Sequence, residues 1–345
     1  MKQDVYIINA KRTPVGKFGK SLLEFPATEL ATIVIKNLLK KHLDIAECID
    51  EVILGNVLSA GLGQNPARIA SWKSGISQNV PSFTINKVCG SGLKSIILAT
   101  QAIQNNDANL IIAGGMESMS RAPFIIEKNM FEIKSEEKTP KDSMIYDGLF
   151  CSLIGEPMGI TAENIAKKYK ISRKEQDEYA LHSHKKAIAA RNAGKFKEEI
   201  IPVEIKNGEK GTIQFLTDEQ PRDNTSLEAL QKLSPVFKKD GTVTAGNASS
   251  LNDAAAMTLV ASEEFVKQHN LKPMAKVITF ASIGLDPNLM GLGAYYAAEK
   301  CLSKTKLKPS NIDLWEINEA FASQSIAVQR LLKIEPGKVN LNGGA

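Results

Sequence analysis

The residue of this chain best placed to do chemistry is Cys89, which lies in the run 86–92, NKVCGSG. The preceding residues 80–85 have the β-branched and aromatic character of a buried strand, and residues 93–103 repeat apolar side chains at helical spacing. A cysteine that caps a helix is next to unpaired backbone N–H groups and the positive end of the helix dipole, and both favour the thiolate. The sequence therefore predicts that Cys89 caps the helix and is an activated nucleophile with a lowered pKa.

The two glycines that follow fit this interpretation, because Gly90 and Gly92 leave room for a substrate carbonyl to approach the sulfur. The alternative is structural. A free cysteine commonly behaves as a small hydrophobic residue, so Cys89 could instead be a buried residue at a tight turn. The local pattern does not distinguish the two interpretations, so the distinction depends on the rest of the chain.

A second polar group precedes another helical pattern further along the chain. In the run 315–322, WEINEAFA, the amide of Asn318 could hold a water or donate a hydrogen bond to an oxyanion. On local context alone, Asn318 is instead a helix cap and Glu319 is a first-turn acid. The small residues of the run 244–253 permit either a slender ligand or a close helix contact along the backbone.

The chain has 345 residues, 43% of them apolar, which is enough for one large α/β domain or two related halves. Its four cysteines form no C-x-x-C pair, which argues against zinc and disulfides and for a reducing, cytoplasmic compartment. Its apolar runs are too short for a signal sequence or a membrane span. The net charge of +5 is dispersed along the chain, so nucleic acid is not an expected partner.

Alternating strand and helix patterns divide the chain into three regions. Residues 1–119 are an N-terminal half, residues 120–246 are a polar loop or cap domain inserted in that half, and residues 247–345 are a C-terminal half. A faint repeat, in which 48–56 is echoed by 311–318, suggests a duplicated unit with a ligand site between the halves. The predicted strands are 5–8, 51–58, 80–85, 109–113, 255–260, 276–282 and 312–317, the predicted helices are 29–41, 93–103, 161–168, 173–192 and 295–302, and a charged stretch spans 134–141.

Five ordered motifs resemble those of thiolases. They are, in chain order, 88–92 VCGSG, 114–120 GGMESMS, 159–164 GITAEN, 246–249 GNAS and 318–322 NEAFA. The resemblance covers essentially the whole chain and is to the acetyl-CoA C-acetyltransferase type. It implies an α/β fold of duplicated βαβαβ halves, which form a five-layered α-β-α-β-α core with an inserted loop domain.

The resemblance also implies which residues carry the reaction. Cys89 matches the nucleophile that takes an acyl group from acyl-CoA, and Asn318 matches the residue that holds a water at the thioester oxyanion of the second substrate. The implied ping-pong reaction converts two acetyl-CoA into acetoacetyl-CoA and CoA, reversibly. Neither cofactor nor metal ion is implied, since the coenzyme A thioester is a substrate. Ser249 matches a contact to the pantetheine arm, and the remaining positions that match the coenzyme A tunnel are Leu149, Met158, Arg222, Phe237, Ala245, Met290, Ala320 and Phe321.

Two departures from the family pattern bear on activity. Pro157 stands where biosynthetic members carry a histidine beside the ligand, which weakens the assignment to short-chain substrates. The sequence stops at the run 342–345, NGGA, before the family's Gly-His-Pro base and its Cys-x-Gly segment, so the C-terminal half is expected to be incomplete. We therefore expect the chain to be acylated slowly at best and to be unable to condense. The histidines that could replace the base all fit solvated positions; they are His42, His182, His184 and His269.

The leading hypothesis is a cytoplasmic thiolase that forms a dimer or tetramer, uses acetyl-CoA and other acyl-CoA substrates, and has no nucleic acid or membrane partner. A degradative 3-ketoacyl-CoA thiolase is favoured instead if longer acyl chains fit near Met158 and Met290. A ketosynthase shares the ancestral fold but differs around the nucleophile. Outside the enzymes, the alternative is a non-catalytic subunit that binds coenzyme A, and the missing base favours it.

Overall fold

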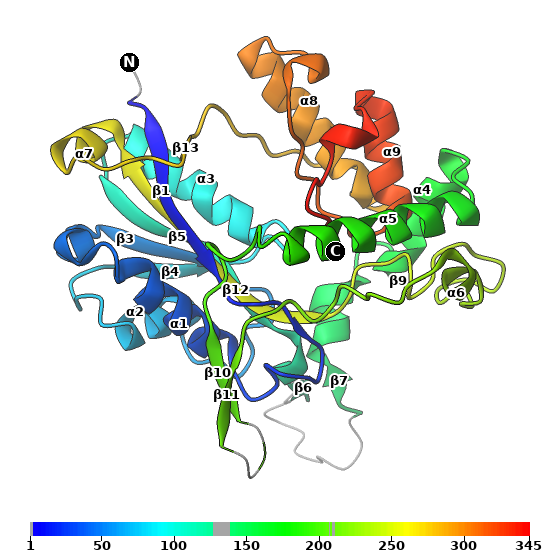
Figure 1. The fold of residues 1–345 in the computed structure, drawn as a ribbon, viewed down its shortest axis with the longest axis horizontal. Coiled ribbons are helices and arrows are strands. Elements are labelled where there is room, and N and C mark those ends of the chain that lie inside the picture. The colour runs from blue at the N-terminus through cyan, green and yellow to red at the C-terminus, as the bar shows by residue number, and fades with distance from the viewer. Residues whose placement is uncertain (1–2, 127–138, 207, 209–210) are drawn as a thin grey trace, which may run out of the picture. The chain divides into compact units, whose positions relative to one another are not determined.

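The computed structural model describes residues 3–126, 139–206, 208 and 211–345, and Figure 1 shows its elements. By its internal contacts the chain divides into two compact units. The first comprises residues 1–148, 198–219 and 251–277, and the second comprises residues 149–197, 220–250 and 278–345. The predicted halves and loop domain, bounded at residues 119 and 246, stay a prediction, which a division by contacts does not test. Of the charged stretch predicted at 134–141, residues 134–138 lie outside the described residues.

Most predicted elements form within a few residues of their predicted bounds, and helix α5 has the bounds that were predicted for it. The first unit contains β1 (Val5–Arg12), β2 (Gly16–Lys17), α1 (Ala27–Leu39), β3 (Glu51–Gly55), α2 (Pro66–Lys73), β4 (Ser82–Ile85), α3 (Ser91–Gln104), β5 (Leu110–Ser118), β6 (Phe124–Ile125), β7 (Lys141–Asp142), β10 (Val203–Lys206), β11 (Thr212–Phe215), β12 (Asn252–Ser262), α7 (Glu263–Gln268) and β13 (Ala275–Lys276). The second unit contains β8 (Phe150–Cys151), β9 (Glu156–Pro157), α4 (Met158–Lys168), α5 (Arg173–Asn192), α6 (Leu227–Gln231), α8 (Gly293–Thr305) and α9 (Ala322–Leu332).

A seven-stranded mixed sheet forms the centre of the first unit. Its strand order is β13-β1-β12-β5-β3-β4, and β2 pairs with β12. Strand β3 is parallel to both β4 and β5, whereas β12 is antiparallel to β1 and to β5. The sequence analysis placed the β12 segment in the C-terminal half, and the structure places it inside this sheet of the first unit.

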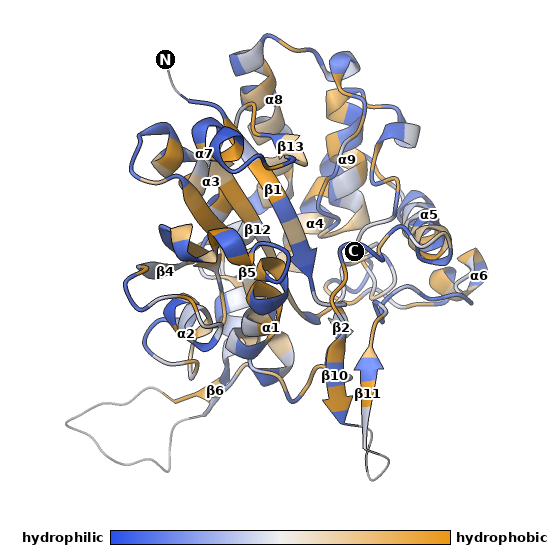
Figure 2. Cartoon of the chain, turned by 60° about the vertical axis from the view of Figure 1, so that its left-hand side comes forward, coloured by the Kyte–Doolittle hydropathy of each residue, from blue (hydrophilic) through white to orange (hydrophobic). Residues whose placement is uncertain are grey.

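Helices cover both faces of the sheet because its strands are apolar on both sides, as the orange strands of Figure 2 show. Successive side chains of a strand point to opposite faces. Leu54 and Ile112 accordingly pack in a core cluster with α1 and α2, whereas their neighbours Ile53 and Ile111 pack in a second cluster with Ile103 of α3. The result is an α-β-α sandwich in which α3 lies on the opposite face from α1 and α2.

The second unit is mainly helical. Helices α4 and α9 pack together through Ile165 and Ala327, and the described residues form only one short ladder there, between β8 and β9. The strands predicted at 276–282 and 312–317 are therefore wrong, since only Lys276 belongs to a strand and Trp315 makes a single bridge to Val339. A segment of strand-like composition becomes a strand only where a neighbour completes its hydrogen bonds along its length. Among the described residues, β1 pairs only with the start of 276–282, and the segment 338–340 pairs with 312–317 only around Trp315.

One close contact in the first unit sets the position of helix α3 on the sheet. A Cβ atom added to Gly55, the last residue of β3, would lie 2.6 Å from the carbonyl carbon of Ser91 at the start of α3. Gly115 is paired with Gly55 on the neighbouring strand, and a Cβ atom there would lie 3.3 Å from the Cα of Gly92. Helix α3 can begin this close to the strand ends only because these residues lack side chains.

We expect Gly55→Ala to lower the free energy of unfolding by about 1–3 kcal/mol, because the added methyl group forces α3 away from β3. Gly284→Ala is the matched control, since a Cβ atom there would meet no atom within 4 Å, and its change should stay within about 0.5 kcal/mol. Denaturant unfolding of both variants measures the difference. Equal stabilities would contradict this account of the helix contact.

Candidate active site

Cys89 lies in a tight loop between β4 and α3. Helix α3 begins at Ser91 and its N-cap is Gly90, so the prediction that Cys89 caps the helix is wrong by one residue. The Ser91 hydroxyl ties the loop together, because it accepts a hydrogen bond from the Lys87 N–H (2.8 Å) and donates one to the Val88 carbonyl (2.6 Å). Cys89 itself is exposed, which excludes the alternative of a buried cysteine at a turn.

Val88, the residue before Cys89, has a strained backbone. Its φ of 49° is in the left-handed region, which a β-branched residue rarely adopts. Such a conformation costs about 1–3 kcal/mol and persists only where the surroundings impose it. Both peptide groups of Val88 are held: its N–H donates to Oδ1 of Asn86 (2.8 Å), and its carbonyl accepts from the Ser91 N–H (3.0 Å). The loop is therefore locked in one conformation, which fixes the position of the adjacent sulfur.

The surroundings of Cys89 raise the pKa of its thiol. The first cause is desolvation of the thiol by surrounding protein atoms, although the residue as a whole is exposed. The negative charge of Glu117 adds to this, and that half-buried carboxylate is held by the N–H groups of Val57 (2.9 Å) and Leu58 (3.1 Å). The prediction of a lowered pKa is therefore wrong, because these effects outweigh a backbone hydrogen bond that favours the thiolate.

We expect the pH dependence of Cys89 alkylation by iodoacetamide to have its midpoint above the value of an ordinary thiol, about 8.5. The raised pKa means that less thiolate is present at any given pH, so the rate at pH 7 is low and continues to rise above pH 9. Mass spectrometry of the peptide that contains Cys89 measures the rate, with Cys89→Ser to identify signal from other cysteines. A midpoint below that of an ordinary thiol would contradict the environment described here.

In the second unit, five of the residues assigned to the coenzyme A tunnel lie in one apolar cluster. They come from four separate stretches of chain and surround Ala162 and Val243; they are Met158, Phe237, Met290, Ala320 and Phe321. Ser249 is joined to this cluster, since its N–H donates to the carbonyl of Ala320 (3.0 Å). The structure thus brings together six of the nine predicted ligand contacts. Leu149, Arg222 and Ala245 lie outside the cluster.

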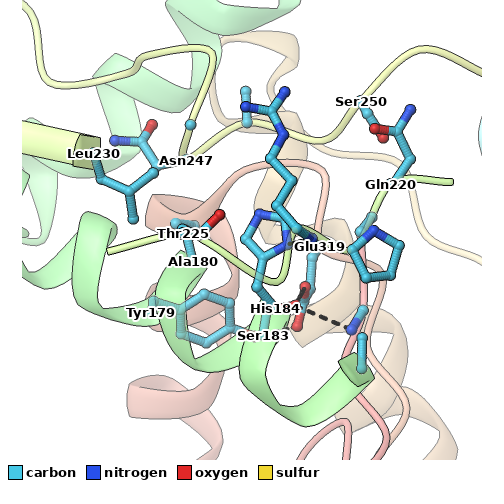
Figure 3. Close-up of a pocket in the computed structure, with 18 of the residues that line it drawn as sticks. Tyr179, Ala180, Ser183, His184, Gln220, Thr225, Leu230, Asn247, Ser250 and Glu319 are labelled. Carbon is cyan, nitrogen blue, oxygen red and sulfur yellow. Dashed lines mark hydrogen bonds between the residues drawn. The ribbon is translucent and has the colours of Figure 1, made fainter. Parts of the chain in front are cut away.

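A cavity of about 90 Å³ lies beside helix α5, and Figure 3 shows its lining. Arg222 and Ala245 contribute to its wall, together with His184 and Glu319. Nδ1 of His184 accepts a hydrogen bond from the Arg222 N–H (3.3 Å). Burial first, and then the charge of Arg222, lower the pKa of His184 and favour its neutral form. The prediction that His184 is solvated is therefore wrong.

The other three histidines differ in exposure. His182 is exposed, as predicted. His42 and His269 are half-buried, and the ring of His269 stacks on Phe265 with 4.2 Å between the ring centroids. Two more positions that were predicted to be solvated are thus partly covered.

Glu163 holds the loop 242–250, which carries two of the predicted ligand contacts. Its carboxylate accepts hydrogen bonds from the N–H groups of Thr242 (2.7 Å) and Val243 (2.8 Å), and the residue is only 9% exposed. This role of Glu163 was not predicted from the sequence, although its position on the helix pattern indicated it. Glu163 follows Ala162 on the buried face of α4, and a charged residue on such a face needs hydrogen-bond partners.

Asn318 is exposed, whereas the adjacent Glu319 is buried. Helix α9 begins at Ala322 with Phe321 as its N-cap, so the interpretations of Asn318 as a helix cap and of Glu319 as a first-turn acid are both wrong. The Glu319 carboxylate instead accepts hydrogen bonds from side chains, among them the Ser183 hydroxyl (2.6 Å). Sequence reasoning could not find this contact because its partners lie far away along the chain.

Within the described residues, no group of three or more His, Cys, Asp and Glu side chains could hold a metal ion. Of the helices in that part of the chain, none combines the length and the apolar character needed to cross a membrane.

The sequence and the fold of this chain match those of known proteins. The model of the thiolase N-terminal domain matches residues 5–264, and that of the thiolase C-terminal domain matches residues 271–345. A probable acetyl-CoA acyltransferase from Staphylococcus aureus (strain COL) is 50% identical over 342 residues, which are 99% of this chain and 87% of that protein. The crystal structure of human mitochondrial 3-ketoacyl-CoA thiolase has a TM-score of 0.95 at 42% identity, over 99% of this chain and 86% of that chain.

The crystal structure of the Bacillus anthracis acetyl-CoA acetyltransferase also has a TM-score of 0.95, at 38% identity and the same coverage of 99% and 86%. The chain therefore belongs to the thiolase family, and it is an acyltransferase enzyme. The predicted thiolase fold is confirmed. The expectation of an incomplete C-terminal half is not supported, because the C-terminal domain model matches residues 271–345.

Proposed function

We propose that this protein transfers an acetyl group between coenzyme A thioesters through a thioester on Cys89, so that two acetyl-CoA give acetoacetyl-CoA and CoA, reversibly. The observation that carries the proposal is the exposed sulfur in a strained, hydrogen-bonded loop at the carboxyl ends of the parallel strands β3 and β4. In the first step the sulfur of Cys89 bonds to the acetyl carbonyl carbon while the bond from that carbon to the coenzyme A sulfur breaks, and the proton of the Cys89 thiol ends on the departing coenzyme A. In the second step the methyl carbon of another acetyl-CoA loses a proton and bonds to the acetyl carbonyl carbon, while the bond from that carbon to the Cys89 sulfur breaks and Cys89 ends as a thiol.

The chemistry requires a sulfur that both attacks and leaves, which a cysteine provides and a serine does not. The raised pKa of Cys89 has two consequences for the first step. The thiol must give up its proton to a base as it attacks, because little thiolate exists at neutral pH. Once formed, a thiolate whose thiol has a high pKa is a stronger nucleophile than one whose thiol has a low pKa.

The proposal assigns the second substrate to residues of the second unit. Asn318 is exposed and would hold the water that stabilises the oxyanion of that thioester. The apolar cluster around Phe237 and Phe321 suits a slender chain such as pantetheine, with the polar backbone of Ser249 beside it. The contacts of Leu149, Arg222 and Ala245 with coenzyme A stay predictions from the family resemblance.

Incubation of the full chain with acetyl-CoA is expected to place one acetyl group on Cys89, which mass spectrometry of the digested protein locates. Cys89→Ser should abolish the adduct, whereas Cys301→Ser, which changes a half-buried cysteine of helix α8, should leave it intact. An acetyl group found on another residue, or binding of coenzyme A without any adduct, would overturn the proposal. The second result would favour the alternative of a non-catalytic subunit.

A longer acyl substrate is the second candidate. Two observations favour it: Pro157 stands where a histidine is expected beside a short-chain ligand, and one similar crystal structure is a 3-ketoacyl-CoA thiolase. If acetyl transfer is correct, acylation of Cys89 by acetyl-CoA should be about tenfold or more faster than by butanoyl- or hexanoyl-CoA, because an enzyme selective for an acetyl group discriminates against added methylene groups by about this factor. Faster acylation by the longer thioesters would replace the proposal with the degradative activity.

The proposed function requires condensation, so it departs from the sequence-based expectation of slow acylation without condensation. A dimer or tetramer and a cytoplasmic location stay predictions. One experiment that measures both CoA release from acetyl-CoA and acetoacetyl-CoA formation separates the two steps. CoA release without acetoacetyl-CoA indicates acylation alone, whereas formation of both products indicates condensation.

A further inference from the structure

The segment around Asn318 belongs to no strand, yet its neighbours are held by hydrogen bonds. The Trp315 N–H donates to the carbonyl of Lys338 (2.8 Å), and the Asn340 N–H donates to the carbonyl of Trp315 (2.8 Å). These bonds place the residues before Asn318 alongside the segment that ends at Asn340. Asn318 itself is exposed, and no other described residue is hydrogen-bonded to its side chain.

Asn340 extends this pairing with its side chain. The residue is 2% exposed and has a φ of 45°, a left-handed conformation that asparagine tolerates. Its Oδ1 accepts a hydrogen bond from the Ile317 N–H (2.8 Å), and its Nδ2 donates to the Ile317 carbonyl (2.8 Å). The amide therefore takes the place of a peptide group of a neighbouring strand. Its orientation is determined by this pattern, because a flipped amide would face donor to donor.

Glu319 fixes the other side of Asn318. Its carboxylate, on a residue only 6% exposed, accepts hydrogen bonds from the second Nδ2 hydrogen of Asn340 (2.7 Å), from the Tyr179 hydroxyl (3.0 Å) and from the Ser183 hydroxyl (2.6 Å). A buried charge is tolerated only when its acceptor sites are filled in this way. The two hydroxyls belong to helix α5, so Glu319 ties Asn318 to that helix.

The Tyr179 hydroxyl is in turn bound, since it accepts a hydrogen bond from Nε2 of Gln329 on α9 (3.2 Å). Burial, and then the charge of Glu319, raise the pKa of Tyr179, so the phenol stays protonated and remains a donor at physiological pH. The network therefore connects α5, α9, Glu319 and Asn340.

We propose that Asn340 and Glu319 are positioning residues that hold Asn318 in the orientation needed for the step it serves in acyl transfer. This rests on the proposed function, which assigns the water of the second substrate to Asn318. The geometry is specific to that residue: Asn340 binds both peptide groups of Ile317, and three donors bind the side chain of Glu319, so the backbone is held on each side of an exposed, unbonded amide.

The test compares variants of the full chain in both half-reactions. Asn340→Asp keeps the shape but removes both donors and places two carboxylates together, and Tyr179→Phe removes one donor while keeping the ring. We expect kcat for acetoacetyl-CoA formation to fall about tenfold for Asn340→Asp and about threefold for Tyr179→Phe. The KM for acetyl-CoA and the rate of Cys89 acylation should stay within about twofold. Tyr296→Phe, at an exposed tyrosine of α8, is the matched control and should change neither.

A cycle with Asn318→Ala identifies the mechanism. If Asn340 acts through Asn318, adding Asn340→Asp to Asn318→Ala should slow condensation no further. An equal slowing in both backgrounds, or a loss of Cys89 acylation that parallels the loss of condensation, would overturn the inference. Should Asn340→Asp fail to fold, Tyr179→Phe in the same cycle decides.

Hydrogen exchange gives a readout that does not depend on turnover. The peptide containing residues 315–320 should exchange faster in Asn340→Asp than in the unaltered chain, and at an unchanged rate in Tyr296→Phe. Unchanged exchange in both variants would overturn the inference even if the enzyme were active. Absence of an acetyl adduct on the unaltered Cys89 would instead refute the proposed function, so the two failures are distinguishable.

Discussion

The loop that carries Cys89 depends on one steric constraint, the contact between the start of α3 and the end of β3. Ser91 can lie this close to the sheet because Gly55 has no side chain. From that position its hydroxyl binds the Lys87 N–H and the Val88 carbonyl, and the loop then holds Val88 in a conformation that it would not adopt alone. Cys89 emerges next. A contact between two backbones thus determines where the sulfur is, and the hydrogen bonds around the loop follow from that contact.

In the second unit, buried carboxylates rather than a steric contact hold the segments that carry candidate site residues. Glu163 and Glu319 are buried carboxylates whose partners in the hydrogen bonds described above are neutral N–H and O–H donors. Each accepts several such bonds, and each thereby fixes an irregular segment that carries candidate ligand or catalytic residues. Charged acceptors bind neutral donors more strongly than neutral acceptors do, so one side chain can replace the ladder that a strand would provide. Irregular backbone near a site can be ordered in this way without belonging to a sheet.

The repeating patterns of the sequence predicted most of the first unit, because strand and helix periodicity reflect burial on the faces of one sheet. Helix α5 and the strands around Cys89 formed as expected. The strand at 312–317 did not, since strand composition says nothing of whether a neighbour is present. The pKa of Cys89 was predicted in the wrong direction because the helix start could be read locally, whereas the hydration of the sulfur and the charge of Glu117 arise from tertiary structure. The partners of Glu319 were invisible for the same reason.

The protonation state of Cys89 also bears on how the protein persists between encounters with substrate. Oxidants such as peroxide react with the thiolate far more readily than with the thiol. The sulfur of an exposed cysteine would be vulnerable if it were ionised at rest, but desolvation and the charge of Glu117 raise the pKa of Cys89 and so favour the protonated thiol. The surroundings that raise the pKa of Cys89 therefore also lower the reactivity of an exposed cysteine toward oxidants.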